Sequence, residues 1–161
     1  MNGAIARFAE AVATSSFGQW ASGSALAYPL ANVVHLLGLV MLVGAIGIVD
    51  LRLAGAFRSI PAAPLSRALT PIAVSGLILM IPSGATMFAA DAITLAGSGV
   101  FRTKLLLIAL ALANAVAFRV LWQNRIGGWD AAPPLWGRLM AAASIVTWLA
   151  VGALGRMIAY S

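Results

Sequence analysis

Residues 33–53 read VVHLLGLVMLVGAIGIVDLRL, a run that is apolar for most of its length. About 20 mainly apolar residues are enough to cross the hydrocarbon core of a bilayer as a helix. The run therefore predicts a membrane-spanning helix. It also contains His35, the single histidine of the chain. An ionisable residue inside a membrane helix is by default a candidate functional residue.

The composition also indicates a membrane protein. Of the 161 residues, 62% are hydrophobic and 9% are charged, and the mean hydropathy is +1.00. A soluble domain carries about 25% charged residues, and a domain of this length cannot hide so much apolar surface from water. We therefore expect residues 1–161 to form one transmembrane domain in a lipid bilayer.

Four segments are long and apolar enough to cross a membrane, which predicts an all-α, integral membrane four-helix bundle. The predicted spans cover about residues 28–53, 68–88, 101–122 and 135–160. Turn-forming sequences separate them, namely SIPAAP (59–64), AGSG (96–99) and GGWDAAPP (127–134).

Ahead of the first span, apolar residues recur at helical spacing. They are Ile5, Phe8, Ala9 and Val12. This pattern predicts a short N-terminal amphipathic helix that lies in the membrane interface. A frayed terminal segment is the alternative.

Small residues predict where the spans approach one another, because lipid gives little hydrophobic drive for helix association. The candidate rows are Ala109, Ala113 and Ala117; Gly44 and Gly47; Gly152 and Gly155; and Gly76 and Gly84. An alanine-rich composition also produces such rows without any contact.

The distribution of basic residues predicts the orientation in the membrane. One end of the bundle carries six of them, namely Arg52, Arg58, Arg67, Arg119, Arg125 and Arg138. The other end carries four, namely Arg7, Arg102, Lys104 and Arg156. Because Lys and Arg favour the cytoplasmic side, we expect both termini outside and the first and third connections in the cytoplasm.

Polar residues meet at one depth in the outer half of the predicted bundle. His35 lies about 10 Å below the outer boundary at helical rise, and Ser83 reaches a similar level on the second span. The candidate pocket contains His35, Ser83, Thr86, Lys104, Arg156 and Tyr160. Cations and one imidazole suit an anionic or quinone-like ligand. The alternative is a neutral structural histidine that hydrogen-bonds between helices.

Charged residues also gather at the inner end, where we expect architecture rather than chemistry. Asp50 is expected to form an ion pair with Arg52 or, across the bundle, with Arg119, because partly buried charges need partners. Asn114, in the middle of the third span, is a candidate for a hydrogen bond between helices.

One cofactor site remains an option, namely a haem b held by His35 and Met80, or a metal on the same pair, because the two residues lie at one depth. Other functional classes lack the residues that they need. Zinc chemistry lacks ligands, and a Ser-His-acid triad lacks an acid near His35, since Asp50 is about 22 Å further along the helix. The scattered basic residues form no nucleic-acid-binding patch.

Separate motifs resemble a family of small bacterial membrane proteins of unknown function, numbered 6644. They are YPLANVVHLLGLVMLVGAIGIVDLRLAG (28–55), Pro71, FRTKLLLIALALANAVAF (101–118), Trp129-Asp130 and GRMIAY (155–160). The resemblance runs from about Ser22 onward and implies a four-span bundle in a bacterial inner membrane. It also implies a histidine where this chain has Arg119, a departure that weakens any paired-histidine cofactor site.

These observations favour a non-enzymatic membrane subunit or small-ligand-binding bundle with its polar pocket around His35. It is expected to act as a homo-oligomer or with a membrane partner. The alternative is a redox module that binds haem b or a quinone at His35. A small transporter or channel, built as an oligomer, is a third option.

Overall fold

The computed structural model describes residues 3–158, all of whose regular elements are helical. In chain order the helices are α1 (Gly3–Thr14), α2 (Ser16–Gly23), α3 (Ala27–Ala54), α4 (Ala62–Ala90), α5 (Ala92–Gly97), α6 (Gly99–Trp122), the 3-10 helix η1 (Gln123–Gly128) and α7 (Leu135–Met157). Four of the segments are long and apolar enough to cross a membrane: α3, α4, α6 continued by η1, and α7. The prediction of an all-α four-span membrane protein is confirmed.

The helix bounds agree with the predicted spans to within two residues, except at the start of the second span and at the end of the fourth, which falls on residues outside the described part of the chain. Helix α4 begins at Ala62, several residues before the predicted position, because Pro61 in extended backbone precedes it. Pro64 lies in its first turn, where a missing N–H group breaks no hydrogen bond. Pro71 and Pro82 both lie inside α4.

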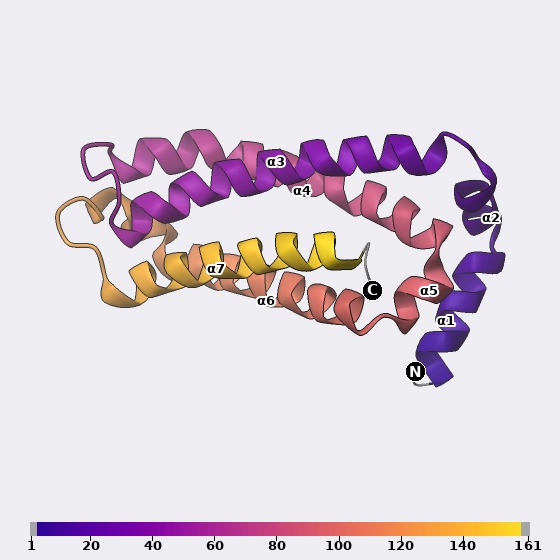
Figure 1. Cartoon of the computed structure of the whole chain (residues 1–161). Coiled ribbons are helices and arrows are strands. Elements are labelled where there is room, and N and C mark those ends of the chain that lie inside the picture. Colours follow the sequence, from indigo (N-terminus) through magenta and orange to yellow (C-terminus); the bar gives the residue numbers. More distant parts are fainter. Residues whose placement is uncertain (1–2, 159–161) are drawn as a thin grey trace.

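The four long helices are arranged as two pairs (Figure 1). Helices α3 and α4 run side by side in one pair, and α6 and α7 form the other. The pairs lie closer at the end that holds the connections 55–61 and 129–134, and they diverge toward the end that holds α1, α2 and α5. Contacts between α3 and α7 join the two pairs.

Helices α3 and α4 touch through their backbones at Gly38 and Gly76. A Cβ atom on Gly38 would lie 2.7 Å from the Gly76 carbonyl oxygen, and one on Gly76 would lie 2.5 Å from that of Gly38. The close approach predicted for Gly76 is confirmed. Those predicted for Gly44, Gly47 and Gly152 are wrong, because a Cβ there would meet no atom within 4 Å.

The N-terminal segment forms two helices rather than the single one predicted. Ser15 separates them, and its hydroxyl accepts a hydrogen bond from the backbone N–H of Gly18 at the start of α2. Helix α1 packs on α5, which the sequence analysis did not predict, and buries Ala9 against Ala92 and Ala96. These short helices lie at the end of the bundle where the pairs diverge (Figure 1).

Candidate ligand-binding site

A hydrogen bond between His35 and Ser83 joins α3 to α4. The distance from His35 Nδ1 to Ser83 Oγ is 3.1 Å. Ser83 is buried, and its hydroxyl donates to the carbonyl of Leu79 at 2.6 Å. Because the hydroxyl proton of Ser83 is donated to Leu79, Ser83 Oγ acts as the acceptor for Nδ1–H of the His35 ring. This tautomer of His35 leaves Nε2 as the acceptor nitrogen of the neutral imidazole. The predicted meeting of these two residues at one depth is confirmed.

The histidine ring lies against a glycine of α4. A Cβ atom on Gly84 would lie 3.2 Å from Cε1 of His35 and 3.5 Å from Nδ1. Any other residue at position 84 would press on the ring. Ser83 and Gly84 thus form a seat that fixes where the imidazole of His35 lies.

Lys104 reaches across from α6 to α7. A Cβ atom on Gly155 would lie 3.3 Å from Lys104 Nζ and 3.6 Å from Cε, so the glycine makes room for the end of the lysine side chain. Lys104 is half-buried and interacts electrostatically with His35. The ion pair found among residues 3–158 lies elsewhere, so no carboxylate in this part of the chain neutralises the ammonium group at salt-bridge distance.

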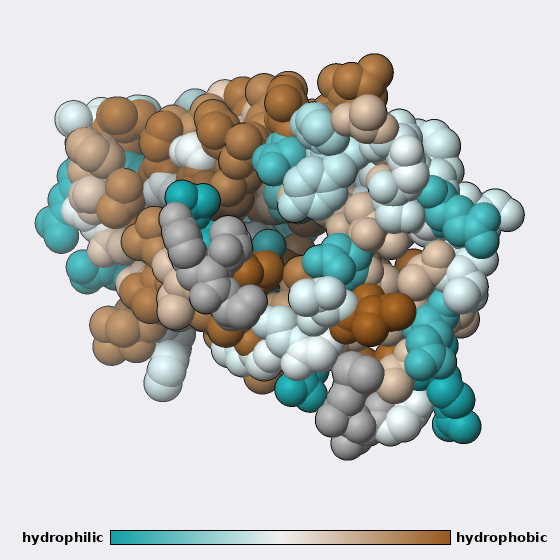
Figure 2. Space-filling view, turned by 45° about the vertical axis from the view of Figure 1, so that its right-hand side comes forward, coloured by the Kyte–Doolittle hydropathy of each residue, from teal (hydrophilic) through white to brown (hydrophobic). Residues whose placement is uncertain are grey.

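His35 and Lys104 belong to opposite helix pairs, in the half of the bundle where the pairs diverge. The space-filling view shows the surface hollowed between the pairs, with hydrophilic groups at the edge of the hollow (Figure 2). Such an opening between helices of a bundle is a common place for a small-molecule site.

The other predicted pocket residues are Thr86, Arg156 and Tyr160. Thr86 donates its hydroxyl to the carbonyl of Pro82 in its own helix at 3.0 Å. Arg156 is exposed near the end of α7 and has an interaction of its own. Tyr160 lies outside the described residues. Among the predicted pocket residues, His35 is linked to Ser83 by a hydrogen bond and to Lys104 by an electrostatic interaction.

The geometry does not fit a haem or metal held by His35 and Met80. Met80 is buried, and a Cβ atom on Gly38 would lie 2.8 Å from Met80 Cγ. The thioether side chain therefore packs against the backbone of α3. The backbones of α3 and α4 are in contact beside it, at Gly38 and Gly76, which leaves no room for a porphyrin between these two helices at this level.

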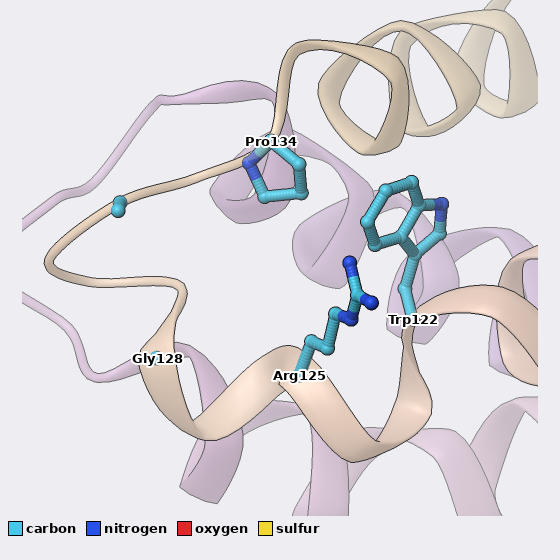
Figure 3. Close-up of a pocket in the computed structure, with 5 residues that line it drawn as sticks. Trp122, Arg125, Gly128 and Pro134 are labelled. Atoms are coloured by element: carbon cyan, nitrogen blue, oxygen red, sulfur yellow. The ribbon is translucent and has the colours of Figure 1, made fainter.

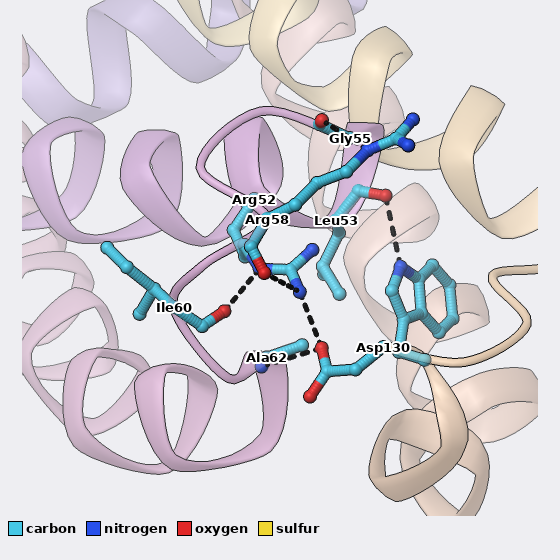
Figure 4. Close-up of polar contacts among 8 residues, drawn as sticks. Arg52, Leu53, Gly55, Arg58, Ile60, Ala62 and Asp130 are labelled. Atoms are coloured by element: carbon cyan, nitrogen blue, oxygen red, sulfur yellow. Dashed lines mark hydrogen bonds and ion pairs between the residues drawn. The ribbon is translucent and has the colours of Figure 1, made fainter.

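The end of the bundle that holds the connections 55–61 and 129–134, predicted to be the inner end, contains a different ion pair from the one predicted. Arg52 is buried and pairs with Asp130 at 2.5 Å, while its Nε donates to the carbonyl of Ile60 (Figure 4). Asp130 also accepts from the backbone N–H of Ala62 at 3.1 Å. The pairing of Asp50 with Arg52 or Arg119 is corrected accordingly. Arg52 faces the connection before α4, where its guanidinium reaches backbone carbonyls and Asp130 together.

The residues expected at this end lie as follows. Asp50 is buried, and its Oδ2 atom has no hydrogen-bond partner. Arg119 is exposed. The predicted hydrogen bond of Asn114 is confirmed, since its Nδ2 donates to the carbonyl of Met140 in α7 at 3.1 Å.

Trp129 and Arg138 close the inner end, a role that the sequence analysis did not assign to them. Trp129 Nε1 donates to the carbonyl of Leu53 at 3.0 Å, and Arg138 Nε donates to that of Ala54 at the same distance. The available signal was the Trp129-Asp130 dipeptide in an otherwise small-residue connection.

A second hollow lies at this end, between η1 and the start of α7 (Figure 3). Its volume is about 330 Å³. The guanidinium of Arg125 lies 5.6 Å from the ring centroid of Trp122, and Pro134 lines the opposite side. The hollow lies at the opposite end of α6 from Lys104, so it is separate from the residues around His35.

Comparison with known proteins supports the resemblance seen in the sequence. The family described as "Family of unknown function (DUF6644)" matches residues 8–161. The chain belongs to the DUF6644 family. No curated protein and no solved structure matches this DUF6644 chain. Its function must therefore be argued from the site.

Proposed function

We propose that this DUF6644 protein is an integral membrane protein that binds a small ligand with a carboxylate or carbonyl group in the outer half of its bundle. The observation that carries the proposal is the placement of His35 and Lys104. Each of these groups comes from one helix pair and is seated on a glycine of the neighbouring helix. The two groups interact electrostatically although they come from opposite helix pairs.

The two side chains supply complementary contacts to a carboxylate or carbonyl oxygen. The Lys104 ammonium offers N–H donors and a positive charge, which a site of low polarity strengthens. His35 offers Nε2, which accepts a proton from an acidic ligand or, once protonated, donates to its oxygen. Ser83 holds the ring in place and does not itself need to contact the ligand.

The single histidine gives a direct test. The full chain is labelled with ¹⁵N-histidine, placed in phosphatidylcholine nanodiscs and titrated with butyrate and, separately, with the neutral ester methyl butyrate. We expect saturable shifts of the His35 ring signals with at least one of these probes. The Lys104→Met variant should weaken this binding tenfold or more, whereas the exposed neighbour variant Arg102→Met should leave it unchanged.

Two results would refute the binding function. One is an absence of saturable shifts with both probes in the unmodified protein. The other is equal binding in the Lys104→Met and Arg102→Met proteins while both unfold at the normal temperature. His35 would then be a structural histidine.

We also propose a location in a bacterial inner membrane, with both termini on the periplasmic side. The support is the excess of basic residues at the end that contains Arg52, Arg58 and Arg138. Because the chain has no cysteine, single-cysteine variants report topology directly. A membrane-impermeant maleimide added to intact cells should label Gly3→Cys and not Ser59→Cys. The reverse labelling would invert the topology.

A further inference from the structure

An apolar groove lies between α3 and α7, next to the candidate site. Its volume is about 510 Å³, within the range of about 300–1,000 Å³ found for small-molecule sites. Leu39, Val43 and Gly44 line one wall, and Trp148 and Gly152 line the other. The two glycines leave the groove open, since a Cβ atom on either would meet nothing within 4 Å.

The groove begins one helical turn from each polar group of the site. Leu39 follows His35 by four residues on α3, a rise of about 6 Å. Gly152 precedes Gly155, the residue under Lys104, by three residues on α7, a rise of about 4.5 Å. The apolar groove therefore begins about one helical turn deeper in the bundle than a ligand head held by His35 and Lys104.

On this basis, and resting on the proposed function, we infer that the ligand is a single-chain amphiphile with an anionic head, of the class of long-chain carboxylates. The head lies between His35 and Lys104, and the chain runs along the groove between α3 and α7 toward the middle of the membrane.

Charge favours an anionic head over a neutral one. The Lys104 ammonium is half-buried beside apolar helices, and a buried charge is stabilised by a charged partner at hydrogen-bond distance. It interacts electrostatically with the imidazole of His35, which supplies no negative charge, and the ion pair found among residues 3–158 involves other residues. A carboxylate would accept from Lys104 with one oxygen and, once the ring is protonated, from Nε2–H of His35 with the other.

The shape of the groove favours one chain. Its walls come from two helices only, and the apolar lining is continuous from Leu39 to Gly44 on the α3 side. The alternatives are a loosely held lipid of the surrounding bilayer, which the groove does not select, and a neutral quinone, which would not need the charge of Lys104. The experiment separates these occupants.

The test compares chain lengths and heads in the same phosphatidylcholine nanodiscs, with the His35 ring signals as the readout. Hexadecanoate should bind at least tenfold more weakly to Gly152→Leu and to Gly44→Leu, which fill the groove from either wall. Gly47→Leu is the matched control, since position 47 is also open but does not line the groove. Butyrate should bind equally to all four proteins.

The need for a charged head is tested with hexadecanol. It should bind at least tenfold more weakly than hexadecanoate to the unmodified protein, and this difference should disappear in the Lys104→Met variant. Unchanged hexadecanoate binding in both groove variants would overturn the inference while butyrate binding keeps the proposed function. Tighter binding of decylubiquinone than of decanoate would show that the ligand is a quinone and not a carboxylate. An absence of both butyrate and methyl butyrate binding in the unmodified protein would remove both proposals.

Discussion

Arg52 shows how one side chain can tie three segments together. It is 4% exposed, and it links the end of α3 to the carbonyl of Ile60 before α4 and to Asp130 after η1. Replacing it by Met would leave the acceptors at the inner end without their donor. Since Asp130 remains partly open to solvent, we expect a loss of about 2–3 kcal/mol in the free energy of unfolding.

The change is measured by thermal unfolding in detergent. Asp130→Asn should cost less than Arg52→Met, because the amide oxygen still accepts from Arg52 and from the N–H of Ala62. Arg67→Met, at an exposed position, serves as the control and should unfold as the unmodified protein does. Equal unfolding temperatures for Arg52→Met and the control would show that the linkage is not stabilising.

Asp50 is the opposite case, a buried carboxyl group that is poorly satisfied. Its Oδ2 atom has no partner, and Ser144 is its polar neighbour on α7. An unsatisfied buried acceptor costs about 1–3 kcal/mol. The apolar variant Asp50→Leu, of similar size, should therefore unfold at a higher temperature than the unmodified protein. Destabilisation instead would mean that Asp50 has a partner outside the chain.

The sequence predicted residue positions along the helices better than it predicted partners. The depth of His35 and Ser83 follows from counting residues along helices of known rise, so their meeting was predictable. The partner of Arg52 was not, because Asp130 lies in a connection whose path no periodicity reports. Lys104 was placed in the pocket, but its seat on Gly155 depends on how two helices are rotated.

At the scale of helices, the contact between α3 and α4 depends on two glycines. Gly76→Ala would place a methyl group 2.5 Å from a backbone oxygen of α3, so the helices must separate. We expect a loss of about 1–3 kcal/mol, as for other overpacked positions. Thermal unfolding of the variant should show it. Gly44→Ala is the control and should be neutral or slightly stabilising, since alanine favours helix. Equal effects of the two changes would contradict the contact.

The same helices show which contacts a sequence cannot specify. All four spans were predictable because length and hydropathy suffice for a helix to cross a bilayer. The pairing of Gly38 with Gly76 was not, because Gly44, Gly47 and Gly152 offer equally small surfaces. In lipid, apolar exposure carries little penalty, so hydropathy does not indicate which small residue faces another helix.

At the scale of the whole molecule, α6 is the helix with the least support from its neighbours. Of its apolar segment, 6% is buried, against 22–28% for the other three spans. Its exposed side includes Ala109 and Ala113, one turn apart. Small residues in such a row let a second helix approach closely. We therefore expect two copies of the chain to pack through α6, which is the homo-oligomer that the sequence analysis anticipated.

Disulfide cross-linking in membranes checks this packing, since no native cysteine competes. Under mild oxidation Ala113→Cys should give a covalent dimer in high yield, because two copies of α6 would bring the sulfur atoms together. Ile78→Cys, exposed on α4 in the other helix pair, is the matched control and should stay monomeric. If neither variant cross-links and the protein has the mass of one chain in nanodiscs, α6 faces lipid alone. The outer site would then be complete within a single copy, as its residues on α3, α4 and α6 already allow.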